Sequence, residues 1–206
     1  MIEMAESGKV SCNCGACALE LNDVQPKMSL LCACEDCRQA GHWAAKHGAA
    51  TPKDIIYSVY FRSDFAAFHG VENMFACQLR ADARSTRILC KSCYSCIGID
   101  HKVSYSDHVF MFQPDHCKAD FDTDVTPIAA INLIDYPHHL APIPSELLPV
   151  FHTFRYPQER ARFVAIDPVF EVFAPPKTPP QGQTIRELIA ALPAARVLDL
   201  APGEQP

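Results

Sequence analysis

The chain has 206 residues, a net charge of −6 and a hydrophobic fraction of 49%. This length suits one domain of ordinary size with a buried core. No apolar run approaches the roughly 18 residues of a membrane helix, and no basic runs with interleaved aromatics appear, so we expect neither membrane nor nucleic-acid partners. The opening MIEMAESGKV lacks the regions of a secretory signal, so we expect a reducing, cytoplasmic compartment.

Short segments of β-branched and apolar residues recur along the chain and indicate strands. Asn, Asp, Gly and Pro residues separate these segments, so the sequence predicts a mainly β domain with antiparallel strands. The expected strands cover 8–12, 16–22, 28–32, 54–60, 74–80, 85–90, 108–113, 127–133 and 163–167.

One early segment, EDCRQAGHWAAKH at 35–47, favours a helix because it opens with acidic residues and contains several helix formers. Gly41 weakens the pattern, so we expect only one or two turns.

The C-terminal part divides at a Pro-rich stretch. Residues 174–183 predict an extended, solvated linker, which ends a compact domain at 1–173. Residues 184–206 predict a short amphipathic helix and tail, with Thr184 as the cap and Glu187 three residues later. Its apolar side chains recur at helical spacing at Ile185, Leu188, Ile189 and Leu192. We expect this helix to pack on the domain or on a partner.

The chain contains eleven cysteines, which in a reducing compartment indicate metal binding rather than disulfides. Nine of them form three tight groups: Cys12, Cys14 and Cys17; Cys32, Cys34 and Cys37; Cys90, Cys93 and Cys96. The other two, Cys77 and Cys117, are expected to be small buried residues.

Two separated pairs of cysteines can close a four-thiolate zinc site, whereas a separate triplet leaves a coordination position open. The economical partition places Cys12, Cys14, Cys90 and Cys93 on one metal ion and Cys32, Cys34 and Cys37 on a second. Spacing alone does not prove this partition, because Cys17 and Cys96 could enter instead.

The pieces CNCGA, CACEDCR and CKSC occur in the order found in a known family. The chain resembles the glutathione-dependent formaldehyde-activating enzymes and centromere protein V, over roughly residues 8–170. The resemblance implies an Mss4-like, twisted antiparallel β architecture in which a structural zinc ties two hairpins. It also implies that Cys12, Cys14, Cys90 and Cys93 hold this zinc.

In the same family the triplet, here Cys32, Cys34 and Cys37, holds a second zinc with an open position. The resemblance therefore implies a carbon-sulfur lyase that joins glutathione, or a similar small thiol, to formaldehyde or a related electrophile. A metal ion deprotonates a bound thiol, which makes its sulfur a nucleophile. The expected partners are a small thiol and a small aldehyde. Whether the chain forms a homo-oligomer is left open.

Three residues after the triplet are further candidates. Arg38 matches an arginine of the family and could clamp a glutathione carboxylate or neutralise the thiolates; the alternative is an arginine bound to nearby backbone. His42 could shuttle protons, serve as a fourth ligand or be purely structural. Trp43 could line the pocket. The later pair His138 and His139 predicts an exposed loop.

Two rival functions remain open. The first is a noncatalytic, zinc-stabilised binding module, whose second site is empty or closed by His42. The second is a biosynthetic tailoring enzyme that uses the same zinc chemistry on another substrate. The expected catalytic set of the leading hypothesis is Cys32, Cys34, Cys37, Arg38 and His42.

Overall fold

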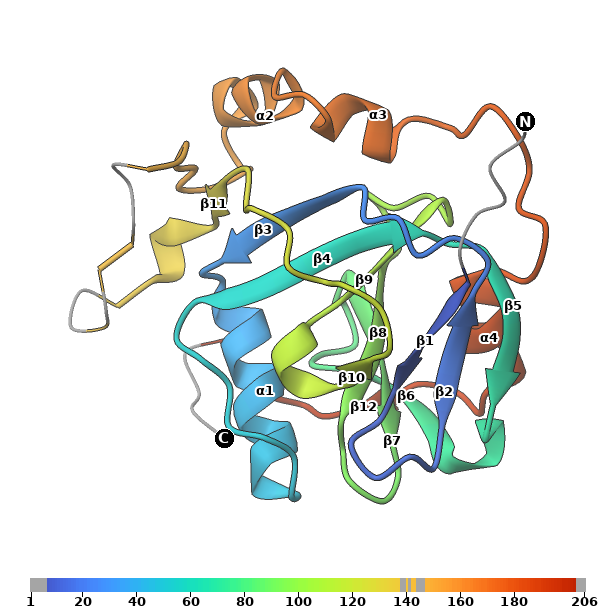
Figure 1. The fold of residues 1–206 in the computed structure, drawn as a ribbon. Helices are drawn as coiled ribbons and strands as arrows, with labels where there is room; N and C mark the ends of the chain where they lie inside the picture. Colours follow the sequence, from blue (N-terminus) through green and yellow to red (C-terminus); the bar gives the residue numbers. More distant parts are fainter. Residues whose placement is uncertain (1–6, 138–139, 141, 144–146, 203–206) are drawn as a thin grey trace.

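The fold is known from a computed structural model that describes residues 7–137, 140, 142–143 and 147–202. The described residues form a mainly β structure with two sheets and four short helices, which confirms the predicted fold class (Figure 1). The larger sheet contains, in spatial order, β11 (Ala130–Ile131), β3 (Met28–Cys32), β4 (Ile56–Arg62), β9 (Val109–Phe112), β8 (Cys96–His101), β7 (Ser85–Cys90), β6 (Met74–Gln78) and β12 (Arg196–Val197). The smaller contains β10 (Lys118–Ala119), β1 (Gly8–Ser11), β2 (Ala18–Leu21) and β5 (Phe65–His69).

Neighbouring strands are antiparallel except at the two edges of the larger sheet. There β11 runs parallel to β3 and β12 runs parallel to β6. Three single turns of 3-10 helix lie between these elements: η1 (Val71–Asn73) between β5 and β6, η2 (Pro114–His116) between β9 and β10, and η3 (Leu133–Asp135) after β11.

Both faces of the larger sheet are buried, because side chains alternate between two apolar clusters. On β4, Val59 and Phe61 join a cluster that includes Leu19 of the small sheet. Ile56 and Tyr60 point to the other face. That second cluster receives side chains from α1 (Glu35–Lys46), α2 (Pro157–Val164) and α3 (Val169–Phe173). The chain thus packs a small sheet on one face of a large sheet and helices on the other.

Two expected elements differ from the structure. The helix that follows Cys34 is not one or two turns long: α1 has 12 residues. Gly41 is buried in it, and a Cβ there would lie 2.7 Å from Pro52 Cβ, so this glycine serves close packing rather than ending the helix. The strand expected at 163–167 is also wrong, because α2 occupies Pro157–Val164 and begins at a proline, which favours the first helical turn.

The C-terminal helix packs on the domain. Helix α4 (Ile185–Ala191) begins with the expected capping box, in which Thr184 Oγ1 accepts from Glu187 N and Glu187 Oε2 accepts from Thr184 N. Ile185 and Leu188 are 0% and 1% exposed and belong to the cluster between the sheets.

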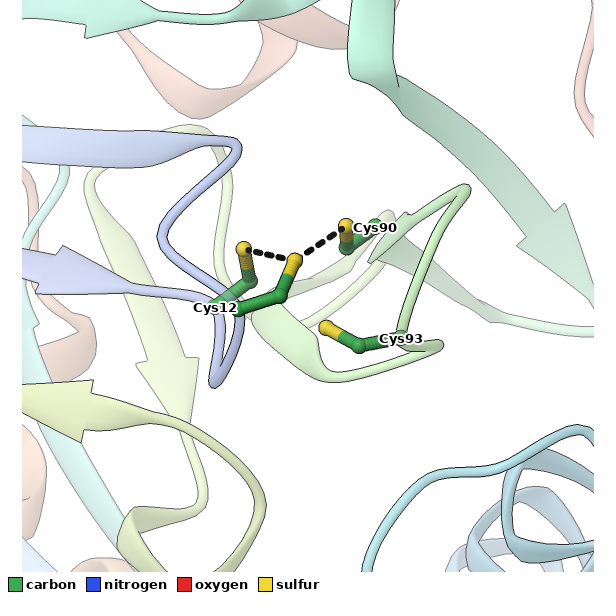
Figure 2. Close-up of side chains that lie close together, drawn as sticks. Cys12, Cys90 and Cys93 are labelled. Atoms are coloured by element: carbon green, nitrogen blue, oxygen red, sulfur yellow. Dashed lines mark hydrogen bonds between the residues drawn. The ribbon is translucent and has the colours of Figure 1, made fainter.

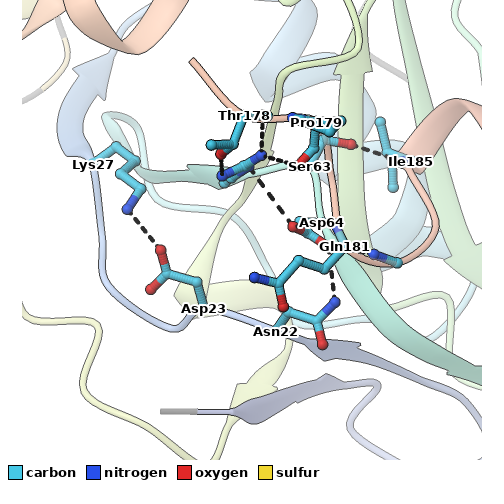
Figure 3. Close-up of polar contacts among 11 residues, drawn as sticks. Asn22, Asp23, Lys27, Ser63, Asp64, Thr178, Pro179, Gln181 and Ile185 are labelled. Carbon is cyan, nitrogen blue, oxygen red and sulfur yellow. Dashed lines mark hydrogen bonds and ion pairs between the residues drawn. The ribbon is translucent and has the colours of Figure 1, made fainter. Parts of the chain in front are cut away.

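The Pro-rich segment before α4 is exposed but anchored at several points (Figure 3). Asp64 accepts hydrogen bonds from Gln181 N and Gly182 N, both at 2.9 Å. Arg62 donates to the carbonyl oxygens of Thr178 and Pro179. The segment therefore forms a strap along the end of β4 instead of hanging free.

The Asp64 carboxylate makes the strap sensitive to acid. Burial acts to raise its pKa, but hydrogen bonds from Asn22, Gln181 and Gly182 hold the pKa below the usual 3.8. A depressed native pKa contributes stability above the unfolded pKa that is lost as pH falls through the native value.

We expect Asp64→Asn to lower the free energy of unfolding at pH 7 by about 2 kcal/mol, because hydrogen bonds to a buried charge are lost. The difference from wild type should shrink as the pH falls below about 4. Urea unfolding across this pH range measures it, with the exposed Asp122→Asn as a control that should match wild type. An equal loss at pH 3 and pH 7 would contradict the assignment.

Candidate metal centres

The first cysteine group joins two hairpins that are distant in sequence. Cys12 and Cys14 lie in the turn after β1, and Cys90 and Cys93 lie at the end of β7 and in the turn that follows (Figure 2). Their sulfur atoms all lie within 4.8 Å of one another. The separation is 3.4 Å from Cys12 to Cys14 and 3.6 Å from Cys14 to Cys90. These distances exceed the roughly 2.05 Å of a disulfide, so the four sulfurs surround a point that could hold a metal ion.

The local backbone supports this arrangement. Gly15, directly after Cys14, has φ +77, a left-handed conformation that glycine adopts without strain. Two backbone N–H groups point at the sulfurs: Cys17 N lies 3.4 Å from Cys12 Sγ, and Ser92 N lies 3.4 Å from Cys90 Sγ. Donors of this kind stabilise negative charge on sulfur.

The thiols of this group do not share one pKa. Burial acts to raise the pKa of Cys93, but hydrogen bonds with Ser95 and Cys14 lower this pKa to about 6. For Cys14, a backbone hydrogen bond at Ala16 acts in the lowering direction, yet Cys93 and Cys12 raise its pKa to about 12. The sulfurs thus compete for protons, and a cation among them would let all four ionise.

The second cysteine group forms where β3 passes into α1. Cys32 ends the strand, Cys34 is the N-cap of the helix, and Cys37 lies in its first turn. Cys34 Sγ accepts from Cys37 N at 3.3 Å, so the sulfur takes the capping position that Ser or Asp usually fills. The Cys32 sulfur lies 3.3 Å from that of Cys34 and 3.9 Å from that of Cys37. The start of one helix therefore brings three thiols together.

Among the described residues, no fourth Cys, His, Asp or Glu joins this group. His42, the expected fourth ligand, is half-buried on α1 outside it. Trp43 is 8% exposed and packs against His47 and Tyr94, with ring centroids 4.2 and 5.7 Å away. The triplet is thus open in the part of the chain that the structure describes, whereas the first group is complete.

Arg38 binds backbone. Its guanidinium donates to the carbonyl oxygens of Ala33 and Asp135 and lies 5.5 Å from the Tyr136 ring centroid. Of the roles that the sequence left open, the structure favours an arginine that ties the start of α1 to the loop after β11.

Arg87 is the charged neighbour that sequence reasoning missed. It lies in β7, opposite Cys77 of β6, and is 4% exposed. Its guanidinium donates to Asp36 O, the carbonyl oxygen of the residue before Cys37, at 3.3 Å. The sequence did contain a signal for this residue: Arg87 lies inside STRILC, a segment whose other residues predict a buried strand.

This cation and the thiols affect one another. Hydrogen bonds from Cys32 and Cys34, assisted by Arg87, lower the pKa of Cys37 well below its usual value although burial opposes the change. The neighbouring Cys32 and Cys37 raise the pKa of Cys34. Without a metal ion, negative charge in this group therefore concentrates on the Cys37 sulfur.

The remaining cysteines lie outside both groups. Cys17 is 1% exposed beside Cys12, in the cluster between the sheets. Cys96 and Cys77 lie in the other cluster, near Arg87, so Cys17 and Cys96 do not share a cluster. Cys77 and Cys117 are 2% and 6% exposed, as expected of small buried residues. His138 and His139 lie outside the described residues.

No family model matches the chain, and no curated protein matches it. Membership of the formaldehyde-activating family therefore stays a prediction. None of the described helices combines the length and the apolar composition that crossing a membrane would require. What the geometry establishes is two cysteine groups that could each hold a metal ion, one of four thiols and one of three.

Proposed function

We propose that the protein is a zinc-dependent enzyme that adds a small thiol, such as glutathione, to formaldehyde or a related electrophile. The observation that carries the proposal is the open group of Cys32, Cys34 and Cys37 beside a complete four-cysteine group. The resemblance of the CACEDCR and CKSC motifs to the formaldehyde-activating family supports the same function.

The donor sets suit zinc. Four or three thiolates are common zinc ligands, and Zn–S bonds of about 2.3 Å place tetrahedral sulfurs about 3.8 Å apart. Four sulfur-to-sulfur separations, two in each group, lie between 3.3 and 3.9 Å. In this proposal Cys12, Cys14, Cys90 and Cys93 hold a structural zinc, which contributes on the order of 10 kcal/mol to folding.

A zinc ion held by Cys32, Cys34 and Cys37 would supply one chemical effect, the deprotonation of a thiol that occupies the open position. In this proposal the thiolate sulfur would form a bond to the carbonyl carbon, the π electrons of the carbonyl would move to oxygen, and that oxygen would take up a proton, which balances the proton that the thiol released. The chain holds the three ligand sulfurs at fixed separations through the cap at Cys34 and the end of β3.

The test compares wild type with Cys34→Ser in the presence of glutathione and formaldehyde. Wild type should contain two zinc ions per chain and form the adduct faster than buffer, whereas Cys34→Ser should keep one zinc and lose at least 100-fold in rate. The control is Cys117→Ala, a buried cysteine outside both groups, which should keep both metals and the activity. No acceleration by zinc-loaded wild type would reject this substrate assignment.

A noncatalytic binding module is the second candidate. Two cavities among the described residues, one beside Arg87 and one beside Arg62, are not lined by Cys32, Cys34 or Cys37, which favours it. This candidate predicts one tightly held zinc per chain. Two zinc ions, one of them readily removed by a chelator, would favour the enzyme.

A further inference from the structure

Arg87 is a buried cation without a carboxylate partner. Four other arginines, Arg62, Arg80, Arg162 and Arg186, each form an ion pair with Asp or Glu, and none is as deeply buried. No ion pair between described residues includes Arg87, and the side chains around it include the thiols of Cys77, which lies opposite it in β6, and of Cys96, which lines the same cavity. A buried charge is costly unless it is paired, so sulfur must supply the counter-charge.

The contacts of Arg87 point to Cys37. The guanidinium donates to the carbonyl oxygen of Asp36, the residue directly before Cys37, at 3.3 Å. Guanidinium stays protonated at all relevant pH, so this positive charge is permanent. Three thiolates around a divalent ion carry a net charge of −1, and Arg87 brings the total to zero. With a monovalent ion, one negative charge would stay uncompensated in an apolar core.

The Arg87 side chain lines a small cavity. Its volume is about 10 Å³, and its lining includes Arg87, Gln113 and His116. The Nε2 atoms of Gln113 and His116 are buried without a hydrogen-bond partner, in side chains that are 5% and 3% exposed. A cavity of this size holds about one water molecule, and two or more polar groups are needed to bind it.

The lining also fits a water molecule chemically. Gln113 Nε2 and the guanidinium can only donate, so the ligand must accept. Burial lowers the pKa of His116, which keeps the imidazole neutral with one nitrogen able to accept. Water can accept from Gln113 and Arg87 and donate to His116 at once.

We propose that Arg87 is the fixed counter-charge and positioning residue of the Cys32–Cys34–Cys37 metal centre, held against Cys37 by one water molecule bound between Arg87, Gln113 and His116. The inference rests on the proposed metal at this group and goes beyond it by assigning the residue that balances its charge. It also predicts a preference of the centre for divalent over monovalent ions.

The experiment measures metal binding rather than catalysis. Metal-free protein is titrated with Co²⁺, whose thiolate charge-transfer absorption reports each site, and a chelator competition gives the affinity of each equivalent. Arg87→Met should weaken the second equivalent by at least 10-fold and alter its absorption, since outer partners of metal ligands typically contribute about 10–100-fold in affinity. The first equivalent should be unchanged, and Arg87→Lys should recover part of the loss.

Arg80→Met is the matched control. Arg80 also contacts Asp36 of α1, but through the carboxylate and away from the thiols, so this variant should bind both equivalents like wild type. Gln113→Leu keeps the guanidinium and removes one partner of the water, and should weaken the second equivalent by a smaller factor. If Arg87→Met does not fold, Arg87→Lys and Gln113→Leu decide the question, since wild-type affinity in both would overturn the inference.

The outcomes separate the two proposals. If wild type binds only one Co²⁺, the proposed function fails and this inference fails with it. If wild type binds two and Arg87→Met holds both as tightly, only the inference is overturned. A crystal structure of the zinc-loaded protein should show one water within hydrogen-bond distance of Arg87, Gln113 and His116; an empty cavity would refute the water.

Discussion

Cys90→Ser is expected to abolish cooperative folding, the largest effect of any single substitution considered for this chain. Cys90 is fully buried at the end of β7, and its sulfur lies 3.6 Å from that of Cys14 in the other hairpin. A structural zinc contributes on the order of 10 kcal/mol, which is comparable to the whole stability of a typical domain, about 5–15 kcal/mol. Serine is a poor zinc ligand, so most of this contribution should disappear.

Far-UV circular dichroism and thermal unfolding, together with zinc content, measure the effect. Cys117→Ala provides the comparison, because Cys117 is buried outside both metal groups and its thiol donates to the backbone oxygen of Gln113. This control should cost about 1 kcal/mol and keep a sharp transition. A chelator should act in two stages on wild type, removing metal from the three-cysteine group first. If Cys90→Ser unfolded at the same temperature and as sharply as wild type, the first group would hold no structural metal.

Cysteine spacing alone could predict that metal-binding turns exist, but not which turns meet. The pair Cys12 and Cys14 reaches Cys90 and Cys93 only because β7 and β1 belong to sheets that pack face to face. That contact depends on long-range pairing, which local patterns do not encode. The economical partition proposed the grouping, the family resemblance implied the same one, and the structure brings these four sulfurs together.

Sequence patterns predicted correctly those features that depend only on neighbouring residues. The capping box at Thr184 and the helix after Cys34 are both readable, because caps and helix formers act within one turn. Strand β8, with the sequence CIGIDH, was not predicted, because Gly98 and Asp100 interrupt its apolar residues and both residue types are uncommon in strands. Arg87 was missed for another reason: its contact with Asp36 depends on α1 packing on the sheet, whereas the sequence offered Arg38, the neighbour along the chain, as one candidate for neutralising the thiolates.

Gly70→Ala is expected to be the most damaging glycine substitution outside the metal groups. Gly70 has φ +65 and precedes η1, between β5 and β6. A Cβ at this position would lie 2.0 Å from the carbonyl oxygen of Ala16, which is backbone and cannot rotate away. Alanine would therefore incur the strain of a left-handed residue, about 1–2 kcal/mol, and also push apart two backbone segments, at a further cost of about 1–3 kcal/mol.

The displaced segment gives this variant a second consequence. Ala16 directly precedes Cys17, whose N–H donates to Cys12 Sγ. A shift of this segment, which leads into β2, should therefore also loosen the first metal group. We expect a loss of about 3 kcal/mol or more in the free energy of unfolding, measured with urea, and weaker zinc retention. Gly48→Ala isolates the strain, because Gly48 has φ +109 with no atom within 4 Å of the added Cβ. It should lose less stability and keep both metals; equal losses in the two variants would mean that contact with Ala16 contributes nothing.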